Sequence, residues 1–415
     1  MSESLDEVVV HLNSKDFGDD ARIGRLRRTR RRSASVMSFT FEPSWLSRGE
    51  PIVLDPALGR YQGDQYAPDG GLLGIFTDTA PDRWGRTLLQ RREAAIARRE
   101  DRRPRVLDDW DFLLGVSDEL RMGALRLADS AGRRFLSDGV IAVPPIARLR
   151  QLEALATRAE RGDQVQLHEE EEELALLIAP GSSLGGTRPK ANFRNQDGLL
   201  WIAKFPSRND TWDVGLWEHI VAELARLAGL WLPRTGVLKL LGEYRTFTAE
   251  RFDRAHGGRR LYASAMTLVG KRDNDAASYL DIADAIARYG SAATIGQDLE
   301  QLFRRVVFNV LTANRDDHLR NHGFVGIPGG WRLSPAFDIN PAPTKRDHAI
   351  ALNELDHTPD LTIVRQTARY YRLRAADADA IISEVTEAVK LWRQKSSGAG
   401  ATRDEIDQMA QAFAI

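Results

Sequence analysis

The sequence predicts an α+β protein of two lobes, with a mixed α/β N-terminal lobe and a mostly helical C-terminal lobe. Three observations lead to this prediction. The chain has 415 residues, more than a single hydrophobic core usually accommodates. Short apolar runs with strand-like alternation recur through the first 250 residues. From Ser278 onward the apolar residues recur with helical spacing instead.

The first elements are expected to be short strands, which end at about Phe41. A glycine-containing segment then precedes a predicted helix over residues 83–99. Further helices are expected over residues 109–114 and 151–161. The arginine-rich run at residues 25–32 lies within the early period-2 pattern. That setting favours exposed residues of an edge hairpin over a nucleic-acid contact.

The middle of the chain is expected to form a small sheet with one helix. Its predicted elements are strands over residues 190–193, 200–205, 236–241 and 244–250, and a helix over residues 218–228. Helices then follow over residues 279–289, 298–313, 361–371, 376–395 and 402–413. The predicted domains are an N-terminal subdomain (1–130), a part with the glycine loop and a hinge (131–253) and a helical C-terminal lobe (254–415).

Composition excludes several classes of site. The chain has no cysteine, which excludes disulfides, thiolate metal sites and cysteine nucleophiles. Its formal net charge of -1 gives no global nucleic-acid signature. No apolar run reaches the length of a membrane span and no secretory leader opens the chain, so a cytoplasmic protein without membrane contact is expected.

Two carboxylates and an amide carry the strongest chemical signal. Asp316 and Asn321 have the D-x-x-x-x-N spacing of a kinase catalytic loop, and Asp338 follows after a short apolar strand, where such enzymes place a metal-binding Asp. Phosphoryl transfer needs a base for the acceptor hydroxyl, and it needs oxygen ligands for the divalent ions that neutralise the nucleotide phosphates. These residues supply both.

The order of the upstream parts strengthens the kinase interpretation. A glycine loop at residues 181–191 precedes a strand that carries Lys204, and the next predicted helix begins at Glu218, the expected partner of Lys204. The loop is not a P-loop, because Thr187 stands where that motif needs lysine. Its backbone amides are expected to approach the phosphates, with polar groups supplied by Ser182, Ser183 and Lys190.

A different reading starts from two histidines. His318 and His322 are spaced i, i+4, and with Asp316, Asp317 and Asn321 they suggest a metal-dependent phosphohydrolase. That alternative leaves the serine-glycine loop and Lys204 unexplained.

With these residues in view, the chain resembles the HipA family of bacterial serine/threonine kinases, the toxins of type II toxin-antitoxin systems. The resemblance covers nearly the whole length. The stretches that carry it are Ile23–Leu26, Phe39–Leu46, Phe76–Asp82, Ser183–Lys190, Ile202–Pro206, Glu250–Arg254, Asp316–Asn321 and Phe337–Asp338.

The resemblance implies a HipA-like, protein-kinase-like fold and a role for each matched residue. Asp316 would be the catalytic base, Asn321 and Asp338 would hold Mg²⁺, and Ser183 would be the autophosphorylated serine, with Ser182 as the alternative. The residues implied to line the ATP site are Ser183, Leu184, Gly185, Gly186, Thr187, Lys190, Lys204, Glu250, Arg251, Phe252, His318, Asn321, Phe337 and Asp338. Asp317 departs from the small residue often found there, and is expected to add charge near the metal ions.

The implied activity is that of an ATP- and Mg²⁺-dependent protein serine/threonine kinase that phosphorylates a cellular protein and itself. The implied partners are a protein substrate and a small helix-turn-helix antitoxin, through which any DNA contact would be indirect. A catalytically dead co-repressor is the non-enzymatic alternative, against which the intact Lys204, Asp316, Asn321 and Asp338 argue.

Overall fold

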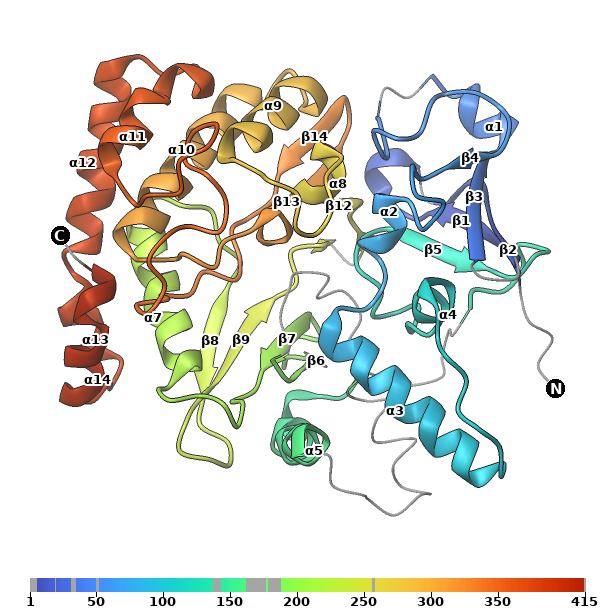
Figure 1. Ribbon diagram of the computed structural model, residues 1–415, viewed down its shortest axis with the longest axis horizontal. Helices are drawn as coiled ribbons and strands as arrows, with labels where there is room; N and C mark the ends of the chain where they lie inside the picture. Colours follow the sequence, from blue (N-terminus) through green and yellow to red (C-terminus); the bar gives the residue numbers. More distant parts are fainter. Residues whose placement is uncertain are drawn as a thin grey trace. The chain divides into compact units, whose positions relative to one another are not determined.

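The computed structural model describes residues 6–18, 20–30, 35–49, 52–136, 143–161, 177, 188–255 and 258–413. The chain divides into two compact units, each made of several stretches of sequence (Figure 1). The N-terminal unit comprises Met1–Ala203, Asp253–Ala263 and Val325–Gly329, and the C-terminal unit comprises Lys204–Phe252, Ser264–Phe324 and Gly330–Ile415. Among the described helices, none has the length and apolar character needed to cross a membrane.

An antiparallel sheet of five strands forms one end of the N-terminal unit. Its order is β4-β3-β2-β1-β5, with β1 (Glu7–Leu12), β2 (Ala21–Arg30), β3 (Ser35–Phe41), β4 (Gln65–Tyr66) and β5 (Leu125–Ala128). The strands predicted up to Phe41 are therefore confirmed, while β5 was not foreseen. Short helices α1 (Pro43–Leu46) and α2 (Gly74–Thr77) follow β3 and β4 respectively.

The arginine-rich strand is not at an edge, so the edge-hairpin expectation was wrong. β2 lies between β3 and β1 and pairs with both, so neither of its sides is an edge of the sheet. The Arg28 side chain is only 5% exposed and its guanidinium contacts Asp6 at 2.8 Å and Asp108 at 3.2 Å. These carboxylates satisfy a buried charge that sequence patterning had placed in solvent.

The helices of the N-terminal unit agree closely with expectation. α3 (Arg83–Arg99) and α4 (Asp109–Leu114) have the predicted bounds, and α5 (Leu149–Arg161) begins two residues early. Asp82 caps α3 by accepting a hydrogen bond from the Gly85 amide, and Asp108 forms a capping box with Asp111 at α4. The next strands are β6 (Lys190–Arg194) and β7 (Leu200–Lys204).

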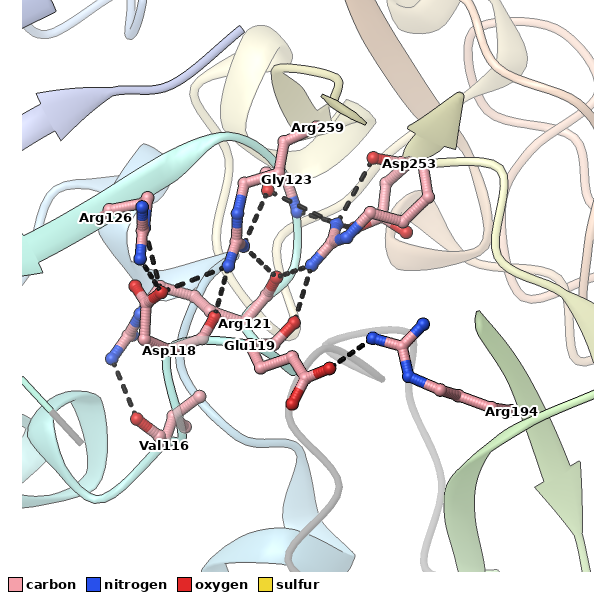
Figure 2. A network of polar contacts seen from close by, with 10 residues as sticks. Val116, Asp118, Glu119, Arg121, Gly123, Arg126, Arg194, Asp253 and Arg259 are labelled. Carbon is pink, nitrogen blue, oxygen red and sulfur yellow. Dashed lines mark hydrogen bonds and ion pairs between the residues drawn. The ribbon is translucent and has the colours of Figure 1, made fainter. Parts of the chain in front are cut away.

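A polar network holds Asp253 and Arg259 in the N-terminal unit (Figure 2). The buried Asp253 carboxylate accepts from the Gly123 amide at 2.8 Å, and Arg259 donates to the Asp118 carbonyl at 2.7 Å. Arg121 is fully buried, which lowers its pKa to about 10, and it donates to the carbonyls of Leu113 and Val116. Such donors satisfy the backbone of a non-repetitive segment that would otherwise be costly to bury.

The C-terminal unit is built around one helix that is buried on nearly all sides, α10 (Ile295–Leu311). It packs against α9 (Tyr279–Tyr289) and α12 (Ala375–Val389). α7 (Val214–Leu227) lies against the antiparallel pair β8 (Thr235–Leu238) and β9 (Thr246–Glu250). The other elements of the C-terminal unit are α8 (Ala265–Val269), β14 (Gly330–Leu333), α11 (Leu361–Gln366), α13 (Trp392–Gly398) and α14 (Arg403–Met409). The short strands β10 (Arg254–Ala255) and β11 (Gly258–Arg259) belong to the N-terminal unit. The strands β12 (Tyr262–Ser264) and β13 (Gly323–Ile327) each have residues in both units.

Several predicted helices differ in their bounds, and for two of them the structure shows the reason. The helix expected over 376–395 is split into α12 and α13, and the break lets Trp392 stack on Phe413 with ring centroids 4.6 Å apart. The helix expected to start at Glu218 starts at Val214, because Asp213 caps it by accepting from the Leu216 amide. Glu218 therefore lies within α7 and is not at its positive end.

Candidate active site

Lys204 lies between two carboxylates in the C-terminal unit. Its Nζ is 2.5 Å from Oε1 of Glu218 and 2.5 Å from Oδ1 of Asp338. Burial alone would lower the pKa of Lys204, but the charges of Asp338 and Glu218 outweigh it and hold that pKa above its usual value. The expected ion pair of Lys204 with Glu218 is thus present, and Asp338 joins it.

The helix α7 explains why Glu218 reaches this ion pair. Trp217, Ile220 and Val221 are buried and fix the helix in the core, while Glu218 is also buried, with its side chain only 4% exposed. A carboxylate in that position needs a cation, since an unpaired buried charge is costly. Lys204 provides it.

Asp338 has an unusual backbone conformation. Its φ of 56° lies in the left-handed region, which non-glycine residues seldom adopt and which often marks a functional site. The preceding residue, Phe337, stacks on Phe252 with ring centroids 5.4 Å apart. The turn therefore directs the Asp338 carboxylate toward Lys204 while the neighbouring side chain is held in an aromatic contact.

The turn after α10 presents Asp316 to solvent. The Asp316 side chain is 67% exposed, and its Oδ1 contacts Nζ of Lys345. Asn321 closes the same turn from a short 3-10 helix (Leu319–Asn321), with Nδ2 3.5 Å from the Asp316 carbonyl. The two residues paired by sequence spacing thus share one compact turn.

Asn321 also carries the feature that best fits a bound cation. Its Oδ1 is buried, yet no described residue donates a hydrogen bond to it. Buried polar atoms are rarely left without a partner, and an amide oxygen is a suitable ligand for Mg²⁺. With the Asp338 carboxylate it would supply the two oxygen ligands predicted for magnesium, and that site stays a prediction.

Asp317 points away from this exposed turn, into the core. Its Oδ2 accepts hydrogen bonds from Tyr279 at 2.6 Å and Asn309 at 2.9 Å, and lies 2.7 Å from Nε2 of His322. Burial alone would raise the pKa of Asp317, but His322 and the Tyr279 hydroxyl hold it below its usual value. The expectation that Asp317 adds charge near the metal ions is corrected: its carboxylate is held in a buried network.

The two histidines of the i, i+4 pair have separate surroundings. His322 belongs to the Asp317 network, whereas His318 is half-buried at the start of the 3-10 helix. Nowhere in the described ranges do three or more His, Cys, Asp or Glu residues gather in a way that could hold a metal ion. The cluster that would support the phosphohydrolase alternative is absent there.

Three residues implied to line the ATP site, Glu250, Arg251 and Phe252, lie at the end of β9 and directly after it. Glu250 is 2.6 Å from Arg234, Arg251 is buried, and Phe252 makes the stacking contact with Phe337. Their implied place in the ATP site stays a prediction.

Lys190 belongs to the N-terminal unit. Its Nζ is 2.6 Å from Oδ2 of Asp82, and both side chains are almost fully buried. The indole of Trp84 donates to the Lys190 carbonyl at 3.3 Å. The ammonium therefore has a structural partner that sequence spacing gave no reason to expect. The other predicted loop residues lie outside the described residues: Ser182, Ser183, Leu184, Gly185, Gly186 and Thr187.

Sequence reasoning missed three residues that contact the turn: Tyr279 and Lys345 from distant parts of the chain, and Asn309 from the preceding helix α10. Asn309 could have been found, because it lies in the last turn of the helix that leads directly to Asp317. For Tyr279 and Lys345, no pattern in the neighbouring sequence predicts a contact with this turn.

A pH-dependent stability is expected from His348 in the same unit. Burial lowers the pKa of His348 from 6.5 to about 4. Between those values the unfolded chain binds a proton that the folded protein does not. The free energy of unfolding should therefore fall as pH decreases from about 6.5 to 4, by on the order of 3 kcal/mol.

Urea denaturation at neutral pH and near pH 4.5 would check this prediction, with His348→Gln as the comparison. The pKa of His219 is also lowered by burial, but His219 is present in both proteins, so their difference reports on His348. An equal loss of stability in both proteins would contradict the prediction.

Comparisons with known proteins bear on the family and the fold of this chain. The sequence model of the HipA-like C-terminal domain matches residues 182–392. No curated protein matches the chain. Among solved structures, HipA of the Shewanella oneidensis MR-1 toxin-antitoxin system, in complex with HipB and operator DNA, is similar over 98% of this chain and 96% of that chain, with a TM-score of 0.67 and 16% identity. The proinflammatory kinase CtkA of Helicobacter pylori matches 55% of this chain and 89% of its own, at 12% identity and a TM-score of only 0.39. The Shewanella structure confirms the predicted fold class.

Proposed function

This chain belongs to the HipA family, and on that premise we propose that it is an ATP- and Mg²⁺-dependent protein kinase acting on serine or threonine hydroxyls. One observation carries the proposal. Lys204 binds both Glu218 and Asp338 in the same unit whose exposed turn holds Asp316 and Asn321. These are the parts that phosphoryl transfer requires, since its catalysis is mostly positioning and charge neutralisation.

The reaction is assigned to this chain's residues as follows. Asp316 accepts the proton of the acceptor hydroxyl while the acceptor oxygen bonds to the γ-phosphorus, and the bond from that phosphorus to the β-phosphate oxygen breaks. Lys204 has three donors, so it can contact a phosphate oxygen while it remains bound to Glu218. Asn321 and Asp338 would hold Mg²⁺, which neutralises charge on the phosphates when bound.

Membership of the HipA family suggests a partner protein for this chain. HipA of Shewanella oneidensis was solved with HipB and its operator DNA. We propose a small helix-turn-helix antitoxin as the partner of this chain, with DNA contact made through that partner. The intact set of Lys204, Asp316, Asn321 and Asp338 favours an active kinase over a catalytically dead co-repressor.

Autophosphorylation is the direct test of this function. We expect purified protein incubated with ATP and Mg²⁺ to gain phosphate on Ser183, detected by mass spectrometry. Phosphoserine carries nearly two negative charges, so the modified protein should bind ATP more weakly. Ser183→Ala should gain no phosphate at this loop, with Ser182→Ala as the matched control that still does.

Three results would count against this assignment. Phosphate on Ser182 alone would move the modification to that residue. Protein that gains no phosphate and transfers none to any acceptor would contradict the kinase. Stoichiometric zinc with hydrolysis of phosphodiesters would favour the phosphohydrolase.

A further inference from the structure

Lys345 contacts the proposed base from a segment that no kinase motif includes. It lies seven positions beyond Asp338, and its Nζ donates to Oδ1 of Asp316. The pair lies wholly within the C-terminal unit. This contact brings a positive charge directly onto the carboxylate that would accept the substrate's proton.

The backbone around Lys345 is hydrogen-bonded to the turn that carries Asp316. The Ala342 amide donates to the Ala313 carbonyl at 2.9 Å, and the Ala349 amide donates to the Arg315 carbonyl at 3.0 Å. The Arg315 guanidinium also donates to the Lys345 carbonyl. These bonds lie on both sides of Lys345 in sequence, so its position beside Asp316 is set by the fold and does not depend on the ion pair alone.

Stability does not account for this pair. The side chains of Lys345 and Asp316 are 47% and 67% exposed, and exposed ion pairs contribute little to folding. The ion pair instead fixes the orientation of the Asp316 carboxylate. An exposed carboxylate on a turn would otherwise sample several rotamers, whereas here Oδ1 is held and Oδ2 has no partner among the residues described.

We propose that Lys345 is a positioning residue for Asp316, an inference that rests on the proposed kinase function. The ammonium fixes Oδ1 and leaves Oδ2 to accept the proton of the acceptor hydroxyl as its oxygen bonds to the γ-phosphorus. Correct placement of the base is itself a large part of its catalytic effect, because a small displacement weakens proton transfer sharply.

Single-turnover autophosphorylation with radiolabelled ATP tests the proposal, since it needs no external acceptor. Lys345→Met should lower the rate at saturating ATP by roughly 10- to 100-fold, a part of what general base catalysis contributes. The ATP concentration for half-maximal rate and the melting temperature should stay unchanged. Lys390→Met is the matched control, because Lys390 forms an ion pair of similar exposure with Glu387 in the same unit.

Amine rescue separates a role of the ammonium from a general disturbance. Adding methylamine or ethylamine should restore part of the rate to Lys345→Ala, while the corresponding alcohols should not. An unchanged rate in Lys345→Met, an equal loss in Lys390→Met, or failure of every amine to rescue would overturn the proposal. If the unmodified protein transfers no phosphate, the kinase function itself has failed, which is a different result from a normal rate in the variant.

Discussion

Asp316→Asn is expected to lose phosphoryl transfer almost completely, by roughly 10²- to 10⁴-fold, while the protein keeps its fold. An amide cannot accept the proton of the acceptor hydroxyl, and general base catalysis contributes about that factor. Because Asp316 is exposed, the substitution leaves no buried charge and should change stability little. ATP binding should persist, since Lys204 and Asp338 are untouched.

Single-turnover transfer and ATP binding by calorimetry would measure the two effects separately. Asp379→Asn is the matched control, because Asp379 is an exposed carboxylate in the same unit and binds Arg365 at 2.8 Å. It should transfer phosphate at the normal rate. Autophosphorylation at a near-normal rate by Asp316→Asn would remove Asp316 from the role of base.

Lys204→Met should be both inactive and strongly destabilised. The substitution keeps the length of the side chain but leaves the buried Glu218 carboxylate without its cation, which typically costs about 3–5 kcal/mol. Asp338 loses the same partner, so the left-handed turn that carries it is also less well held. Urea denaturation would give the stability change, and transfer from ATP would give the activity.

A second substitution distinguishes the two consequences. Adding Glu218→Gln to Lys204→Met removes the uncompensated charge, so much of the lost stability should return while transfer stays lost. Unchanged stability in Lys204→Met would show that Glu218 is not dependent on this ion pair. Recovery of activity in the double variant would show that Lys204 has no part in binding phosphates.

The order and type of the main elements were largely predictable from the sequence. α3, α4 and α9 have the predicted bounds because their caps are local: Asp82, Asp108 and Ser278 each accept a hydrogen bond from an amide three residues on. One difference involves residues far apart in the sequence, since Trp392 stacks on Phe413 where α12 and α13 separate, whereas the earlier start of α7 follows from its local cap, Asp213.

The chemical identity of the site was also in the sequence. The spacing of Asp316 and Asn321 places them in one turn, and the order of Lys204, Glu218 and Asp338 predicted parts that do meet in the structure. Such motifs can be recognised because the chemistry requires these residue types and a given fold places them in a fixed order along the chain.

Only the tertiary structure decided which neighbours these residues have. It turned Asp317 into the core beside Tyr279 and Asn309, brought Lys345 to Asp316, and paired Lys190 with Asp82 from 108 positions away. A charged or polar side chain takes whichever partner the packing of distant elements brings within reach, because burial without one is costly. That partner leaves no periodic or local trace in the sequence.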